Sequence, residues 1–118
     1  MRTRTMTLTA AAALMLTLPL RAEHLPDGNP AKGEELYNGT CVACHGADGA
    51  GAFDGIPELT GKSGRLAKPD DLLFEHMRDG FQSEGSFMAM PAKGGNPDLS
   101  DQDLVDLLAY MRKAFGGE

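Results

Sequence analysis

The chain has 118 residues, 42% of them hydrophobic, and its 17 acidic residues outnumber its 11 basic residues, giving a formal charge of −6. This length suits one small domain. The acidic balance disfavours binding to nucleic acid or to an anionic membrane surface, so we expect no nucleic-acid partner.

Residues 1–22 are expected to be a signal peptide, followed by a single domain at 23–118. A short basic segment opens the chain, and Met6 to Leu20 are almost all apolar or small. This run is shorter than the ~20 residues of a membrane span. We therefore expect cleavage near Ala22 rather than an uncleaved anchor, and no stable membrane insertion afterwards. Export places the domain in the periplasm with eight basic and 17 acidic residues, a formal charge of −9.

The first helix is predicted to begin at Pro30, with Asn29 as its N-cap. It should run to about Tyr37, because Asn38-Gly39 has the chemistry of a helix end. Gly33 inside it is unfavourable by about 1 kcal/mol relative to alanine. A close crossing with another helix would explain that glycine.

The most informative stretch is Cys41-Val42-Ala43-Cys44-His45. Two thiols three positions apart, followed directly by an imidazole, form the attachment signature of a c-type haem. Cys41 and Cys44 can each form a thioether bond with a vinyl group of the porphyrin. His45 can then bind the iron through its neutral Nε2. One such motif predicts one covalently bound haem c per chain.

Three other interpretations of the cysteine pair are weaker. A redox dithiol should open a helix after a strand in a βαβ pattern, and no such pattern is visible. A zinc site needs four ligands, and the sequence has no third cysteine. A disulfide across two intervening residues would be strained and would constrain little chain.

Glycine-rich stretches follow His45, and a buried porphyrin would give such long loops a surface to pack on. The next predicted helix covers about Pro69 to Arg78 and ends at Asp79-Gly80. The last begins at Ser100, whose spacing to Asp103 resembles a capping box. Its apolar stripe should pack against the first helix near Tyr37. The residues of the stripe are Leu104, Leu107, Leu108, Met111 and Phe115. Nothing indicates a β-sheet.

The second axial position of the iron largely separates electron carriers from ligand-binding proteins and enzymes. The candidate ligands are Met77, Met88, Met90, Met111, His24 and His76, or the position is open. Met88 and Met90 lie in a loop between helices, far in sequence from His45. Pro91 biases Met90 toward an extended backbone, which can project its thioether outward. Two residues apart, both methionines face the same way, so spacing does not choose between them.

The chain resembles the class I cytochromes c, and especially the small bacterial monohaem group that includes cytochrome c-five. The matching features are Gly33, Tyr37, the 41–46 motif, Met90 to Gly95, Leu99 to Asp101, and Tyr110-Met111. The resemblance implies an all-α fold, with three to four helices around one covalently attached haem and the first and last helices crossing. It makes Met90 the distal ligand and His45 the proximal one. It also assigns the Pro57 carbonyl as acceptor of the His45 Nδ1–H.

That resemblance implies a periplasmic electron-transfer protein and not an enzyme, with iron cycling between the ferric and ferrous states. Its partners would be redox proteins: a donor dehydrogenase or reductase, and an acceptor oxidase or reductase. Two alternatives stay open. The chain could be the haem subunit of a specific periplasmic dehydrogenase, or a gas- or peroxide-binding protein whose distal ligand is displaced.

Overall fold

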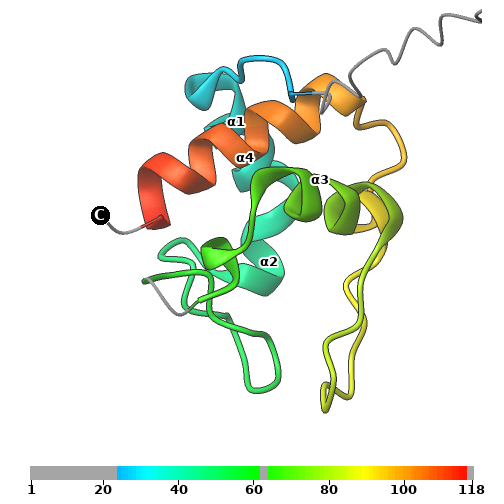
Figure 1. Ribbon diagram of the computed structural model, residues 1–118. Helices are drawn as coiled ribbons and strands as arrows, with labels where there is room; N and C mark the ends of the chain where they lie inside the picture. The colour runs from blue at the N-terminus through cyan, green and yellow to red at the C-terminus, as the bar shows by residue number, and fades with distance from the viewer. Residues whose placement is uncertain (1–23, 62–63, 117–118) are drawn as a thin grey trace, which may run out of the picture.

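The computed structural model describes residues 24–61 and 64–116, whose regular elements are all helical, with no strand among them (Figure 1). The predicted signal peptide at 1–22 lies outside them. The four α-helices are α1 (Pro30–Leu36), α2 (Val42–His45), α3 (Asp70–Asp79) and α4 (Asp101–Phe115). Shorter helical turns cover Tyr37–Cys41, Arg65–Ala67 and Ala92–Gly95. No helix in this part of the chain is both long enough and apolar enough to cross a membrane. The predicted all-α class is confirmed.

Helix α1 begins as its sequence predicts. The Asn29 side chain accepts hydrogen bonds from the backbone N–H groups of Ala31 (3.0 Å) and Lys32 (3.3 Å), and Pro30 occupies the first helical position. An N-cap of this kind satisfies donors that have no partner within the helix.

The α-helix ends at Leu36 with Tyr37 as its C-cap, close to the predicted end, but the predicted C-cap role of Asn38-Gly39 is wrong. Gly39 does not adopt the positive φ of a helix-ending glycine. The backbone instead widens into a π-helical turn, Tyr37–Cys41, and continues directly into α2. Tyr37 is fully buried in this turn, so tertiary packing overrides the local stop signal. The helical path ends at Gly46, whose φ is 77°.

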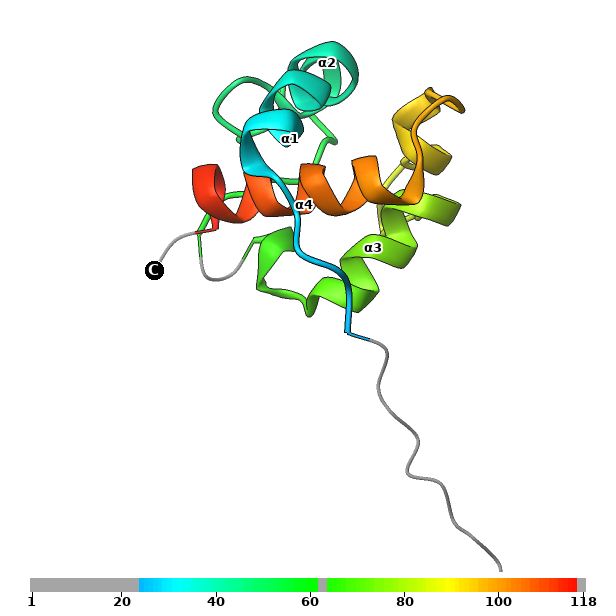
Figure 2. The same ribbon diagram turned by 90° about the horizontal axis from the view of Figure 1, so that it is seen from above.

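Helices α1 and α4 cross closely, as Figure 2 shows from above. A Cβ on Gly33 would overlap the backbone carbonyl of Asp106, so only glycine permits this approach. Asp106 also accepts a hydrogen bond from the Asn29 backbone N–H at 2.8 Å. The ring of Tyr37 packs on Tyr110 and Phe115, with centroids 5.3 and 5.4 Å apart. The predicted crossing of the first and last helices is confirmed.

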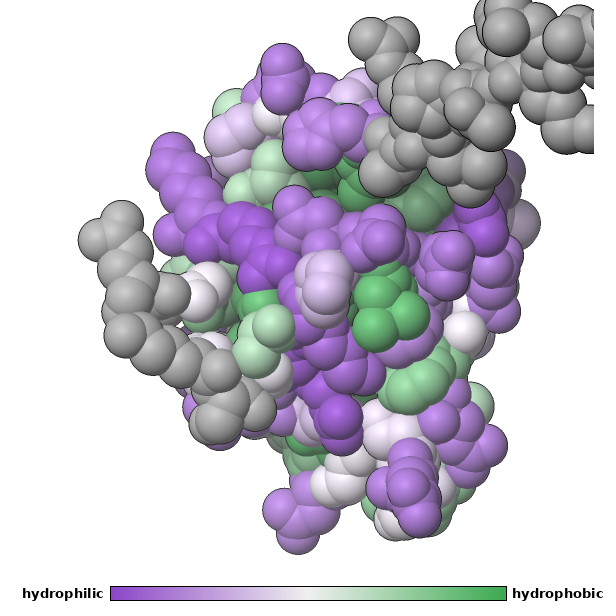
Figure 3. Space-filling view, in the orientation of Figure 1, coloured by the Kyte–Doolittle hydropathy of each residue, from purple (hydrophilic) through white to green (hydrophobic). Residues whose placement is uncertain are grey.

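Helix α4 matches its prediction. The Ser100 side chain accepts from the Asp103 N–H at 3.1 Å, and the Asp103 carboxylate accepts from the Ser100 N–H at 2.8 Å, completing the capping box. All five residues of the predicted apolar stripe are buried. By contrast, the face shown in Figure 3 is mostly hydrophilic, with apolar residues in separate spots.

Helix α3 begins one residue later than predicted, after Pro69, and ends at Asp79, followed by the C-cap Gly80, whose φ is 83°. The chain then enters a long loop that runs back toward the same helix. Phe81 and Met90 form an isolated antiparallel bridge within this loop. The bridge brings the predicted ligand segment beside the end of α3.

Candidate haem site

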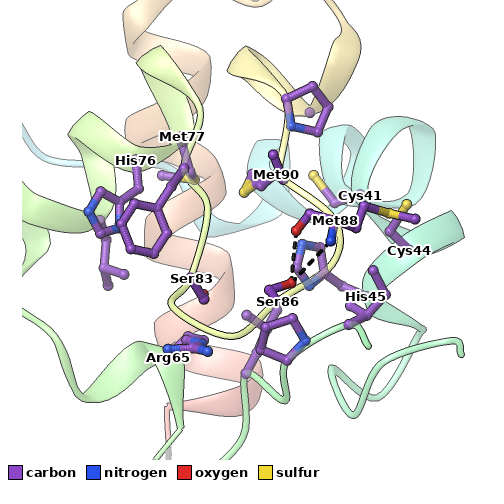
Figure 4. Close-up of a pocket in the computed structure, with 18 of the residues that line it drawn as sticks. Cys41, Cys44, His45, Arg65, His76, Met77, Ser83, Ser86, Met88 and Met90 are labelled. Carbon is purple, nitrogen blue, oxygen red and sulfur yellow. Dashed lines mark hydrogen bonds between the residues drawn. The ribbon is translucent and has the colours of Figure 1, made fainter. Parts of the chain in front are cut away.

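A single cavity lies between α2, the 55–59 segment, α3 and the 81–94 loop. It contains about 1170 Å³ not filled by protein atoms, part of it open to solvent. The described residues that line it are mainly apolar, and none is Asp or Glu. In Figure 4, Cys41, Cys44 and His45 lie on one side, His76 and Met77 on the other, and the segment from Ser83 to Met90 between them.

Cys41 and Cys44 both line the cavity and are free thiols. Cys44 is exposed and Cys41 is partly buried. Burial, followed by the neighbouring Cys44, raises the pKa of the Cys41 thiol to about 11. Redox dithiols need the opposite, a lowered thiol pKa. The microenvironment of Cys41 therefore disfavours the dithiol interpretation.

His45 ends α2 and lines the same cavity. Burial lowers the pKa of its imidazole, which favours the neutral form that binds metals. Its Nδ1 is buried without a hydrogen-bond partner. The predicted bond to the Pro57 carbonyl is thus not formed in the structure, although Pro57 lines the cavity. An unsatisfied buried nitrogen costs about 1–3 kcal/mol, and iron bound at Nε2 would leave Nδ1 in need of a separate acceptor. The Pro57 contact remains a prediction for the haem-bound protein.

Five of the six candidate axial ligands line the cavity. Met77 and Met111 are buried in α3 and α4 as core residues. Met90 is partly buried against the core, whereas Met88 is 41% exposed. This difference favours Met90, which sequence spacing could not separate from Met88.

The two histidine candidates are placed differently. His76 stacks on Phe81, with ring centroids 3.7 Å apart. Burial, followed by the nearby Lys68 ammonium, lowers the pKa of His76. His24 is exposed and does not line this cavity. His76 is therefore occupied in packing, and His24 lies elsewhere.

The role of Tyr37 at this site was not predicted. Its side chain is 0% exposed, and its hydroxyl donates a 2.6 Å hydrogen bond to the Gly46 carbonyl, directly after His45. Burial raises the Tyr37 pKa, so the phenol stays protonated and able to donate. The bond ties the end of α2 to the α1–α4 crossing. A tyrosine eight positions before His45 offered the only sequence signal.

We expect Tyr37→Phe to destabilise the haem-loaded protein by about 1–2 kcal/mol, because the Gly46 carbonyl loses its donor. Thermal unfolding followed by circular dichroism should show a fall of about 5–10 °C. Tyr110→Phe is the matched control, since the Tyr110 hydroxyl makes no hydrogen bond among the described residues. It should change stability by less than about 0.5 kcal/mol. Equal losses in the two variants would contradict the role of the hydroxyl.

The fold and the site together define the class of protein. An all-helical domain with crossing terminal helices, and a cavity that brings a Cys-x-x-Cys-His motif and a methionine together, is a class I cytochrome c. The fit of the site to haem rests on its apolar lining and on the two free thiols and the imidazole that face the same cavity.

Known proteins support this class. The chain matches the family model described as cytochrome c oxidase, cbb3-type, subunit III over residues 28–111, and it belongs to that cytochrome c family. It is 38% identical to cytochrome c-555 of Prosthecochloris aestuarii over 69% of this chain and 83% of the relative. It is 40% identical to cytochrome c-554(548) of Halomonas halodenitrificans over 70% of this chain and 93% of the relative.

A longer relative is the cytochrome c subunit of a quinone alcohol dehydrogenase from Gluconobacter oxydans, 32% identical over 75% of this chain and 19% of the relative. Membership of the family confirms the predicted class, the covalently bound haem c and the electron-transfer function.

Proposed function

We propose that this protein is a periplasmic one-electron carrier whose haem is bound by Cys41 and Cys44, with His45 and Met90 as axial ligands. One observation carries the proposal: all four side chains line the same cavity. The bound haem supplies a ferric/ferrous couple. With imidazole and thioether both engaged, the chain leaves no axial position for a substrate.

The remaining residues have supporting roles. Apolar side chains along the cavity exclude water, which favours the ferrous state and raises the potential. The Pro57 carbonyl would accept the His45 Nδ1–H and fix the orientation of the ring. Partner proteins would dock transiently through an interface below ~1,200 Å².

Periplasmic location rests on residues 1–22, whose basic start and short apolar run are those of an exported protein. The acidic balance that remains at 23–118 suits a soluble carrier that does not bind anionic surfaces.

The alternative with a specific observation behind it is a dehydrogenase haem subunit. The Gluconobacter relative carries that name. In that case redox partners would be permanent rather than exchanged. A gas- or peroxide-binding role is disfavoured, because it would require the proposed Met90 ligand to leave the iron.

An optical redox titration of the exported protein tests the proposal. We expect a low-spin spectrum, reversible one-electron behaviour and slow carbon monoxide binding by the reduced protein. Mass spectrometry should give the mass of the chain from about residue 23 plus one haem. Stoichiometric co-purification with a dehydrogenase would instead support the subunit role. Rapid carbon monoxide binding at neutral pH would support a ligand-binding protein, and a colourless product would overturn the haem assignment.

A further inference from the structure

The Met90 segment is attached to the end of α3 by two backbone hydrogen bonds. The Phe81 N–H donates to the Met90 carbonyl at 3.0 Å, and the Met90 N–H donates to the Phe81 carbonyl at 2.8 Å. Gly80 permits this approach, because a Cβ there would lie 2.9 Å from the Met90 carbonyl. The position of Met90 is therefore coupled directly to that of Phe81.

A single bridge of this kind is not stable alone. Even a complete two-stranded hairpin is marginal in water. Within the described residues, Phe81 and Met90 form only an isolated bridge, and the rest of their loop is irregular. The bridge needs support from outside the loop if Met90 is to stay in one place.

The Phe81 side chain has that support. The imidazole of His76 lies parallel to the Phe81 ring, with centroids 3.7 Å apart and an interplanar angle of 9°. The Lys68 ammonium lies 4.5 Å from the centroid of the same ring, within cation–π distance. His76 belongs to α3, so one partner of the ring sits on a helix.

Lys68 is held by the last helix. Arg112 of α4 donates to the Lys68 carbonyl at 2.6 Å and to the Leu66 carbonyl. Its guanidinium also binds the Asp70 carboxylate at 2.6 and 2.8 Å. Contacts thus run without a break from the buried α4 to Lys68, to the Phe81 ring, and through the bridge to Met90.

We propose that the stack of Lys68, Phe81 and His76 keeps the Met90 thioether in place as the iron ligand. Phe81 and His76 are positioning residues that act on the distal ligand through the backbone bridge. This role rests on the proposed assignment of Met90 as that ligand.

The test uses haem-loaded protein and compares Phe81→Leu, which keeps apolar volume but removes the aromatic face, with His76→Ala and His76→Phe. In the ferric state, Phe81→Leu and His76→Ala should both weaken the far-red sulfur–iron band. In the ferrous state, they should speed carbon monoxide binding about three- to tenfold, the range of one lost aromatic contact. His76→Phe restores a flat ring and should behave like the native protein.

Leu72→Ala is the matched control, because Leu72 lies on α3, is 38% exposed and is not among the residues that line the cavity. It should leave the band and the carbon monoxide rate unchanged. Native behaviour in both Phe81→Leu and His76→Ala would overturn the positioning role alone. A band that survives Met90→Ala would overturn the ligand assignment, and the positioning role with it.

Discussion

Met90→Ala is expected to abolish the weak far-red sulfur–iron band of the ferric protein and to open the iron to carbon monoxide in the ferrous state. The thioether is the only sulfur ligand proposed for the iron, so its loss removes the transition outright. The potential should also fall, on the order of 0.1 V within the ~0.8 V range that axial ligands span. Absorption spectroscopy and a redox titration of the purified holoprotein measure both effects.

Met88→Ala is the control for this result. Met88 lies two residues away, lines the same cavity and is 41% exposed. Its backbone is held by Ser86, whose hydroxyl donates to the Met88 carbonyl at 2.8 Å, and truncation of the side chain leaves that bond intact. The band should persist in Met88→Ala. If Met88→Ala removes it and Met90→Ala does not, the ligand assignment is wrong.

The parts of the fold that sequence could predict are those set by local chemistry. The Asn29 and Ser100 caps, the glycine that ends α3 and the apolar stripe of α4 all depend on residues within a few positions of one another. The Cys41 to His45 motif is equally local, because its spacing alone places two thiols and an imidazole on one helical turn.

The parts that sequence could not predict depend on contacts between distant residues. Asn38-Gly39 has the local preference of a helix end, yet the burial of Tyr37 against α4 continues the helix into the haem motif. The hydrogen bond from Tyr37 to the Gly46 carbonyl likewise exists only because that π-helical turn forms. A pattern of apolar residues contains no signal for either.

The distinction between Met88 and Met90 as iron ligand also depends on a contact between residues that are distant in sequence. Both share one face of an extended segment, so side-chain alternation cannot separate them. The bridge to Phe81 separates them, by pairing Met90 with the end of α3 and leaving Met88 exposed. Phe81 lies nine residues before Met90, and no sequence motif predicts that the two residues pair.

The second prediction with a large effect concerns Gly33, at the crossing of α1 and α4. A Cβ added at this position would overlap the Asp106 carbonyl and lie 2.8 Å from the Cβ of Tyr110. The Asp106 obstacle is backbone, so α1 and α4 must separate to relieve it. Gly33→Ala should therefore destabilise the holoprotein by about 3 kcal/mol, even though alanine gains about 1 kcal/mol of helix propensity. Chemical denaturation followed by circular dichroism measures the change.

Gly39→Ala is the control, in the same helical path, and its effect on stability should have the opposite sign. Gly39 has no positive φ, and a Cβ there would meet nothing within 4 Å. Alanine should therefore stabilise the protein by about 0.5–1 kcal/mol, through helix propensity and a less flexible unfolded chain. Because both substitutions add the same methyl group, only the crossing distinguishes them. Equal effects of the two would mean that the separation of α1 and α4 does not require glycine at position 33.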